Sequence, residues 1–124
     1  MNAVLELAGV HTHIGAYHIL HGVDLAVPEG QVTVLLGRNG AGKTTTLRTV
    51  MGLYAASRGS IAFRGEAIHG QATPEIAQRG IAYVPETMGI FTDLTVQENM
   101  VLGAASGPPD PARLDWIFGF FPPL

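Results

Sequence analysis

The sequence predicts an α/β domain, and three features of its middle part lead to that prediction. The run QVTVLLG at 31–37 is almost entirely apolar, which is typical of a strand covered on both faces. A glycine-rich loop follows, and four apolar residues then recur at the spacing of one helical face, namely Leu47, Val50, Met51 and Tyr54. The run IAYVP at 81–85 predicts another buried strand. Strand, glycine-rich loop and helix in this order are what a phosphate-binding loop requires.

Shorter elements are predicted on either side of this region. The segments VLELAGV at 4–10 and VDLAV at 23–27 favour strands, and the turn PEG follows the second one. The segment 57–68 is interpreted as two short strands around Arg64-Gly65. A short helix at 73–80 is expected to have Thr73 as its N-cap, Pro74 at its first position and Gly80 just after its end.

Two helices are predicted in the last third of the chain. The segment TVQENM at 95–100 begins a helix with a capping box, in which Thr95 pairs with Glu98. After a loop at 105–112, a final helix begins at Asp110-Pro111. Its predicted apolar face consists of Leu114, Ile117, Phe118 and Phe121.

The composition is that of one small and rather apolar domain. The chain has 124 residues, of which 47% are hydrophobic and 14% charged, against roughly 25% charged in a typical globular domain. Such a chain is well buried or leaves apolar surface for a partner. The net charge of −3 does not favour a nucleic-acid partner, and the lack of cysteine excludes disulfides and thiolate metal sites. The sequence lacks a signal-peptide pattern and an apolar run near the roughly 18 residues of a membrane span, so we expect an intracellular protein.

The strongest functional signal is GRNGAGKT at 37–44, which matches the phosphate-binding pattern G-x-x-x-x-G-K-[ST]. Glycines are needed because backbone N–H groups must approach phosphate oxygens closely, and the following helix adds the positive end of its dipole. Lys43, the only lysine of the chain, would place a compact charge between the β- and γ-phosphates, and the Thr44 hydroxyl would bind Mg²⁺. The predicted nucleotide-binding residues are Gly37, Arg38, Asn39, Gly40, Ala41, Gly42, Lys43, Thr44 and Thr45, and Lys43 is also counted as catalytic.

Longer stretches around this loop resemble the ATP-binding subunits of ABC transporters. They are GVDLAVPEGQVTVLLGRNGAGKTTTLRTVMGL, GSIAFRGEAI and RGIAYVPETMGIFTDLTVQENM. The last stretch and LDWIFGFFPPL are similar to the subunits of branched-chain amino-acid importers, and the subunits of urea importers share most of these features. The resemblance covers essentially the whole chain but only about the first half of the family's domain.

This resemblance implies an α/β fold of the P-loop NTPase type, with a RecA-like core and an ABC-type antiparallel β subdomain. It implies that residues 1–90 form the β subdomain and the phosphate-loop core. Residues 91–124 would be the exit of the Q-loop and the start of the helical subdomain, within which the chain ends.

The resemblance also implies roles for positions outside the phosphate loop. Glu86 stands at the family's Q-loop position, so it is expected to contact Mg²⁺ or its water and to report the nucleotide state to a membrane subunit. It is therefore counted as both catalytic and metal-binding, although the residues alone would also allow a surface glutamate or a general base. The family usually stacks an aromatic residue on adenine where this chain has Ile14, so His13 or Tyr17 would have to substitute.

Several motifs of the family do not occur in these residues. No run of four apolar residues ends in Asp-Glu, and no LSGGQ-like signature or downstream switch histidine follows. A second acidic Mg²⁺ site and an adjacent catalytic glutamate are therefore missing. We expect the 124-residue chain to bind ATP with Mg²⁺ but not to hydrolyse it alone.

Two other groups of residues allow a functional interpretation. Four histidines could hold zinc, but no acid or cysteine completes a set and the segment indicates strand, turn and strand, so a polar loop is favoured over a metal site; they are His11, His13, His18 and His21. The apolar residues after Glu86 are either ordinary core or a docking groove for a helix of a membrane subunit, and the same question applies to the rings of the last helix. They are Met88, Ile90 and Phe91, and Trp116, Phe120 and Phe121.

Taken together, these features predict the ATP-binding subunit of an ABC importer for branched-chain amino acids. The complete protein would be a transport ATPase that pairs with a second ATP-binding subunit and acts with two membrane-spanning permease subunits and, indirectly, a periplasmic substrate-binding protein. We expect it in the cytoplasm, on the inner face of the cell membrane. The alternatives are the equivalent subunit of a urea or amide importer and a non-catalytic nucleotide-binding fragment. A small phosphate-loop kinase is disfavoured because only Arg113 follows residue 79 as a further arginine.

Overall fold

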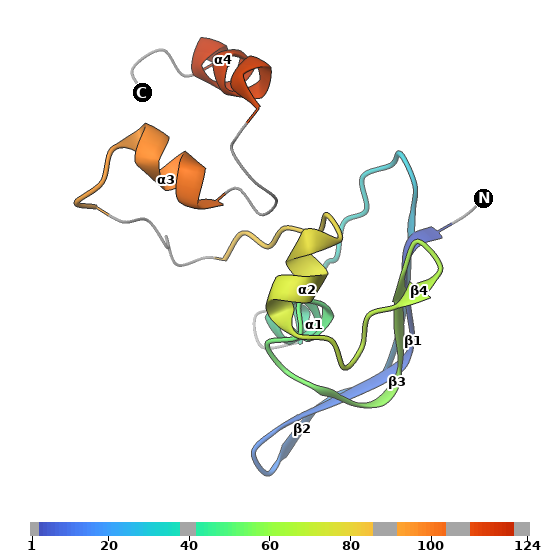
Figure 1. Ribbon diagram of the computed structural model, residues 1–124. Helices are drawn as coiled ribbons and strands as arrows, with labels where there is room; N and C mark the ends of the chain where they lie inside the picture. The colour runs from blue at the N-terminus through green and yellow to red at the C-terminus, as the bar shows by residue number, and fades with distance from the viewer. Residues whose placement is uncertain (1–2, 38–41, 86–91, 104–109, 121–124) are drawn as a thin grey trace. The chain divides into compact units, whose positions relative to one another are not determined.

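A computed structural model describes residues 3–37, 42–85, 92–103 and 110–120, and the chain divides into two units, Met1–Tyr83 and Val84–Leu124 (Figure 1). The first unit contains an antiparallel sheet with the helices α1 and α2. The second unit contains the helices α3 and α4. The predicted nucleotide-binding residues all belong to the first unit, whereas Glu86 belongs to the second.

The sheet has four strands in the order β2-β1-β3-β4, and each neighbouring pair is antiparallel. The strands are β1 (Ala3–Ile14), β2 (Tyr17–Pro28), β3 (Ala56–Phe63) and β4 (Glu66–Ala67). The predicted strands at 4–10, at 23–27 and around Arg64-Gly65 are thus confirmed. The strand, turn and strand predicted for the four clustered histidines are confirmed, with residues 15 and 16 as the turn. The histidines therefore lie on β1 and β2 and not in the polar loop that was also expected.

Three residues with positive φ shape the hairpin of β3 and β4 and the approach of β3 to β1. The turn residues Arg64 and Gly65 have φ of 50° and 81°, which is the type I′ geometry that matches the twist of a hairpin. Within β3, Gly59 has φ of 88°, and a Cβ there would lie 2.4 Å from the carbonyl oxygen of Gly9. Only glycine therefore allows β3 to approach β1 this closely, at the point where their pairing shifts register.

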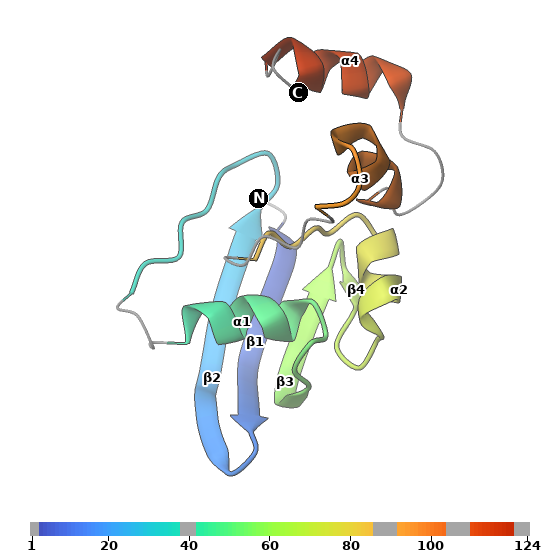
Figure 2. The same ribbon diagram turned by 90° about the vertical axis from the view of Figure 1, so that its left-hand side faces the viewer.

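Helices α1 (Lys43–Val50) and α2 (Thr73–Gln78) lie on the same face of the sheet (Figures 1 and 2). The core between them and the sheet consists of Leu7, Val10, Leu20, Val50, Met51, Ile61, Ile68 and Ile76. Full burial of side chains of this size contributes about 1.5–3 kcal/mol each. Apolar packing therefore holds α1, the helix that follows the phosphate loop, against β1, β2 and β3.

The predicted apolar face of the first helix is only partly correct. Val50 and Met51 are buried, but Leu47 keeps 47% of its surface exposed and Tyr54 lies beyond the helix. The helix ends earlier than predicted because the N–H of Gly52 donates to the Thr49 carbonyl and that of Leu53 to the Arg48 carbonyl. This pair of bonds is the Schellman pattern that closes a helix.

The N-cap of α2 is Ala72 rather than the predicted Thr73. The carbonyl of Ala72 accepts from the N–H groups of Glu75 and Ile76 at 3.0 and 3.1 Å, so the helix begins at Thr73, one residue earlier than predicted. Gly80 follows the C-cap Arg79 with φ of 104°, as predicted for a residue just past the helix.

The apolar runs at 31–37 and 81–85, both predicted as buried strands, form no strand. Val32, Leu36 and Val84 expose 93%, 85% and 89% of their surface. A strand exists only when a neighbour takes its backbone hydrogen bonds, and no segment of the described chain pairs with either run. The part of the expected α/β core that these runs would build is therefore not formed by the described residues.

The second unit confirms both predicted helix starts. Helix α3 (Val96–Gly103) begins with the capping box, because the Glu98 N–H donates to the Thr95 hydroxyl at 3.1 Å and the Thr95 N–H to a Glu98 carboxylate oxygen at 3.0 Å. Helix α4 (Pro111–Phe120) begins after Asp110, whose carboxylate accepts from the Ala112 N–H at 3.0 Å. Phe121 of the predicted apolar face lies outside the described residues, as do Met88, Ile90 and Phe91.

Candidate nucleotide-binding site

The first turn of α1 has the features of an anion-binding site. Its N-cap is Gly42, in the left-handed region with φ of 90°, and no side chain caps the helix. The first turn also contains no acidic residue. Among the described residues, no side chain therefore caps the N–H groups at this end, and the positive end of the helix dipole favours negative charge beside them.

The side chain of Lys43 spans the phosphate loop. Its ammonium donates to the carbonyl oxygen of Gly37, so the side chain of Lys43 reaches back to the first residue of the predicted loop. Arg38, Asn39, Gly40 and Ala41 lie outside the described residues. The structure thus brings Lys43, which follows the N-cap Gly42, into contact with Gly37.

The threonines of α1 divide between two environments. Thr44 is exposed and Thr45 half-buried, whereas Thr46 and Thr49 are buried on the side that faces the sheet. An exposed hydroxyl in the first turn of the helix fits the oxygen ligands that Mg²⁺ takes at a phosphate. An ammonium, uncapped N–H groups and an exposed hydroxyl are groups that suit a polyphosphate with Mg²⁺, and Thr44 is the predicted metal ligand that the structure describes. Glu86, the other predicted ligand, lies outside the described residues.

The tip of the β1–β2 hairpin presents different side chains on its two faces. Thr12 pairs with Leu20, His13 with His18 and Ile14 with Tyr17, and the pairing shifts register between Thr12 and His13. Thr12 and Leu20 are buried against α1, and side chains alternate between faces, so Ile14 and Tyr17 belong to the face that carries α1.

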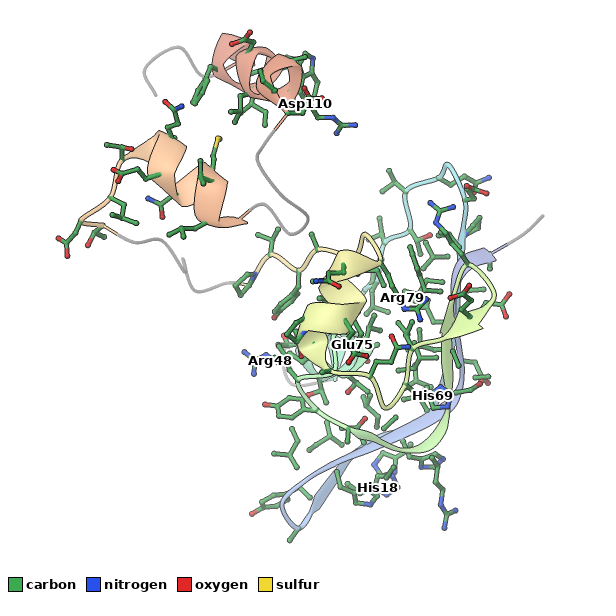
Figure 3. The ribbon with its side chains drawn as sticks, viewed as in Figure 1. His18, Arg48, His69, Glu75, Arg79 and Asp110 are labelled. Atoms are coloured by element: carbon green, nitrogen blue, oxygen red, sulfur yellow. The ribbon has the colours of Figure 1, made fainter. Side chains whose placement is uncertain are left out.

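His13 and His18 belong to the opposite face of the hairpin. There the rings of His13 and His18 stack with centroids 4.1 Å apart, and His21 and His11 lie 3.9 and 5.1 Å from His18. His18 lies near the end of the hairpin in Figure 3. Desolvation, and then the charges of His21, His13 and His11, lower the pKa of His18. In the described part of the chain, no group of three or more His, Cys, Asp or Glu side chains is arranged to hold a metal ion.

The tract that precedes Glu86 is connected to α1 through an arginine. Arg48 donates to the Tyr54 hydroxyl at 3.2 Å, and Figure 3 shows it projecting from α1 away from the sheet. Hydrogen bonds to Tyr83 and then Tyr54 raise the pKa of Arg48 above its usual range. Tyr83, the first residue of YVPE, is therefore held beside the helix that begins at the phosphate loop.

The family described as ABC transporter matches residues 20–120. The chain belongs to the ABC transporter family. The high-affinity branched-chain amino acid transport ATP-binding protein BraG of Pseudomonas aeruginosa is 37% identical to this ABC transporter chain over 123 residues, which are 98% of the chain and 53% of BraG. The Fe(3+) ions import ATP-binding protein FbpC of Mesorhizobium japonicum is 38% identical over 104 residues, 83% of the chain and 29% of FbpC. The ribose import ATP-binding protein RbsA 1 of Agrobacterium fabrum is 35% identical over 102 residues, 82% of the chain and 20% of that protein.

Solved ABC transporter cassettes share the fold. A nucleotide-free ATP-binding cassette has a TM-score of 0.76 and 27% identity over 90% of this ABC transporter chain and 44% of that cassette. A cassette in its ADP conformation has a TM-score of 0.76 and 26% identity over 91% and 44%. The predicted fold class, an α/β P-loop NTPase of the ABC type, is thus confirmed, and the chain spans about half the length of these cassettes and of BraG. No helix in the described ranges is long and apolar enough to cross a membrane.

Sequence reasoning overlooked three residues of the site's support. Thr12, Thr46 and Thr49 are the buried polar side chains of the described core. A signal was present, because Thr46 and Thr49 are three residues apart and precede Val50 on the side that packs on the sheet. Polar residues at core positions of a helix usually hold hydrogen bonds, and these do.

Proposed function

We propose that this chain provides the phosphate-binding part of the ATP-binding subunit of an ABC importer. The observation that carries the proposal is the Lys43 ammonium lying across the loop to Gly37, at the uncapped start of α1. A compact cation and free N–H groups at one point suit the β- and γ-phosphates of ATP.

Each residue of the site would have a distinct role. The backbone of Gly37 to Thr45 would surround the phosphates, Lys43 would neutralise charge between the β- and γ-phosphates, and the Thr44 hydroxyl would hold Mg²⁺. Glu86 would contact the metal or its water and sense the nucleotide state. Bound Mg²⁺ would supply charge neutralisation on the phosphate oxygens. Residues 1–90 would thus form the β subdomain with the phosphate loop, and 91–124 the Q-loop exit and the start of the helical subdomain.

The base of ATP would stack on Tyr17 rather than on His13. Tyr17 belongs to the α1 face of the hairpin and is 75% exposed, with Ile14 opposite it. His13 belongs to the other face, stacks on His18 and lies 3.0 Å from the Ser57 hydroxyl. Its ring would have to leave these partners to reach a base.

We infer that the complete protein hydrolyses ATP, pairs with a second ATP-binding subunit and works with two permease subunits on the inner face of the membrane, served by a periplasmic binding protein. The 124-residue chain alone would bind ATP without turning it over, because it lacks the acidic strand end and the signature motif. Branched-chain amino acids are the favoured cargo because the likeness to BraG covers 98% of the chain, against 82–83% for the ribose and iron relatives. A urea importer remains the alternative.

The test is ATP binding by the purified chain in Mg²⁺, measured by calorimetry. Lys43→Ala should weaken binding about tenfold or more, because a hydrogen-bonded charge is worth roughly 1.5–3 kcal/mol. Arg113→Ala is the matched control, because it removes one positive charge from exposed α4, and it should bind as the parent does. Equal binding by Lys43→Ala and the parent would refute the phosphate site, and Mg²⁺-dependent ATP hydrolysis by the chain alone would refute the binding-only role.

A further inference from the structure

Three hydroxyls lie in an otherwise apolar core. Thr12, Thr46 and Thr49 expose 0%, 4% and 3% of their surface. Burial of a hydroxyl is unfavourable unless it is hydrogen-bonded, and valine has nearly the same shape. Packing alone therefore does not explain threonine at these positions, and the hydrogen bonds must be considered.

The bonds of Thr12 and Thr49 have a definite direction. The Thr49 hydroxyl donates to the carbonyl oxygen of Thr45 at 2.7 Å. The hydroxyl oxygens of Thr12 and Thr49 lie 3.0 Å apart. Since a hydroxyl has a single hydrogen, Thr12 must donate to Thr49. A relay thus runs from β1 through Thr49 to the Thr45 carbonyl.

Thr46 holds the preceding peptide unit in a similar way. Its hydroxyl donates to the Gly42 carbonyl at 2.7 Å, and its N–H donates to the same carbonyl at 2.8 Å. A peptide unit is planar and trans, so the Gly42 carbonyl and the Lys43 N–H point in opposite directions. Because Thr46 holds the Gly42 carbonyl along the helix, the Lys43 N–H points out of the N-terminal end of α1.

We propose that this relay, from the Thr12 hydroxyl through the Thr49 hydroxyl to the Thr45 carbonyl, positions the first turn of α1 on β1. It thereby keeps the phosphate-binding N–H groups and Lys43 at a fixed position relative to the hairpin tip. The hairpin tip follows Thr12 directly, since Ile14 is two residues further along β1. The relay thereby connects the base end of the site to its phosphate end. This inference rests on the proposed ATP-binding function, and Thr12 and Thr49 are positioning residues.

The test compares hydroxyl loss with methyl loss at Thr49. Thr49→Val keeps the branched shape and loses the hydroxyl, whereas Thr49→Ser keeps the hydroxyl and loses the methyl group. ATP affinity in Mg²⁺ should fall about threefold to tenfold in Thr49→Val, corresponding to the net worth of one hydrogen bond, and should stay near the parent in Thr49→Ser. The Lys43 and Thr44 amide resonances of the nucleotide-free chain should shift in the valine variant only.

The double variant Thr12→Val/Thr49→Val separates positioning from stability. It removes both hydroxyls, so neither is left in the core without a partner. We therefore expect its midpoint of unfolding in urea to be nearly that of the parent. Its ATP affinity should nevertheless remain threefold to tenfold lower, about as in Thr49→Val alone, because both changes break one relay. The double variant also tests the relay if Thr49→Val alone fails to fold.

The outcomes distinguish this inference from the proposed function. If Lys43→Ala loses ATP while the double valine variant binds like the parent, the relay does not position the site. If Thr49→Ser binds as weakly as Thr49→Val, core volume matters and the relay is refuted. If the parent itself binds no ATP, the proposed function and the relay are both overturned.

Discussion

Leu20 of β2 lies so close to Gly42 that a Cβ on the glycine would come within 2.9 Å of the leucine Cδ2 atom. Gly42 is the N-cap of α1, and Leu20 is buried in the core three residues after the start of β2. This contact joins the hairpin strand to the point where the phosphate loop becomes a helix. It makes Gly42 sensitive to substitution for two independent reasons, namely space and backbone conformation.

Gly42→Ala should lower both the stability and the ATP affinity of the chain. The left-handed conformation costs an alanine about 1–2 kcal/mol, and the end of the Leu20 side chain must also shift. Gly30→Ala is the matched control, because Gly30 has φ of 73° and nothing within 4 Å of its Cβ position. Urea unfolding should show a loss in both variants, whereas calorimetry should show weaker ATP binding in Gly42→Ala alone. Unchanged ATP affinity in Gly42→Ala would contradict the assigned position of the loop.

Tyr17→Ala should weaken the binding of ATP but not that of inorganic triphosphate. Stacking of a base on an aromatic ring is worth about 1–3 kcal/mol, so the ATP affinity should fall at least about fivefold. Tyr17→Phe should bind like the parent because it keeps the ring. His13→Ala should also bind like the parent, since His13 belongs to the other face of the hairpin. A loss in His13→Ala without one in Tyr17→Ala would reverse the assignment.

The stacked histidines should make the folded chain less stable in weak acid. The pKa of His18 is lowered in the folded state, so the unfolded chain takes up a proton first as the pH falls through about 6.5. The contribution of His18 is thus fully present above that pH and is lost as the pH falls toward its lowered folded pKa. Urea unfolding at pH 7.5 and 5.5 should show a smaller decrease in His18→Asn than in the parent. A ring proton of His18 that titrates by NMR at or above pH 6.5 would contradict this.

Arg79 should contribute more to stability than its exposed ion pair suggests. Its Nε donates to the Gln71 side chain at 2.9 Å and its Nη1 to a Glu66 carboxylate oxygen, so it connects α2 to β4, as Figure 3 shows. Arg79 uses two different nitrogens for these bonds, whereas lysine carries all its donors on one nitrogen, so Arg79→Lys should lose about 1 kcal/mol. Glu66→Gln keeps an acceptor on a side chain that is 69% exposed, and it should lose less than about 0.5 kcal/mol. Equal losses in the two variants, measured by urea unfolding, would argue against the double role.

Thr95→Ala should shorten or melt α3. Loss of an N-cap costs about 1 kcal/mol of helix stability, and α3 has no buried residue within the described chain to compensate. Carbon chemical shifts of residues 96–103 should move toward random-coil values, whereas Thr95→Ser should keep helical values. Bonds from the Thr95 N–H and then its hydroxyl lower the pKa of Glu98, so in the parent the cap should weaken as the pH falls below about 4.5 through that lowered pKa. A helix in Thr95→Ala that matches the parent would contradict the cap.

Sequence reasoning succeeded where a few neighbouring residues determine the structure. The capping box of Thr95 and Glu98 and the turn at Arg64-Gly65 each depend on no more than four consecutive positions. It failed at 31–37 and 81–85, where apolar and β-branched residues predict strands. Their composition reports a preference for a sheet, but hydrogen bonds from another segment decide whether a strand forms.

The phosphate pattern, its single lysine and the family were determined by the sequence alone, because they reside in residue types at fixed spacing. The tertiary structure decided which threonines are buried and which of His13 and Tyr17 shares a face with α1. The bond between Thr12 and Thr49 joins residues 37 positions apart. The register shift between Thr12 and His13 decides which side chains of the hairpin tip share a face with α1. Such relationships depend on how strands pair and how a helix packs on them, and no local pattern contains that information.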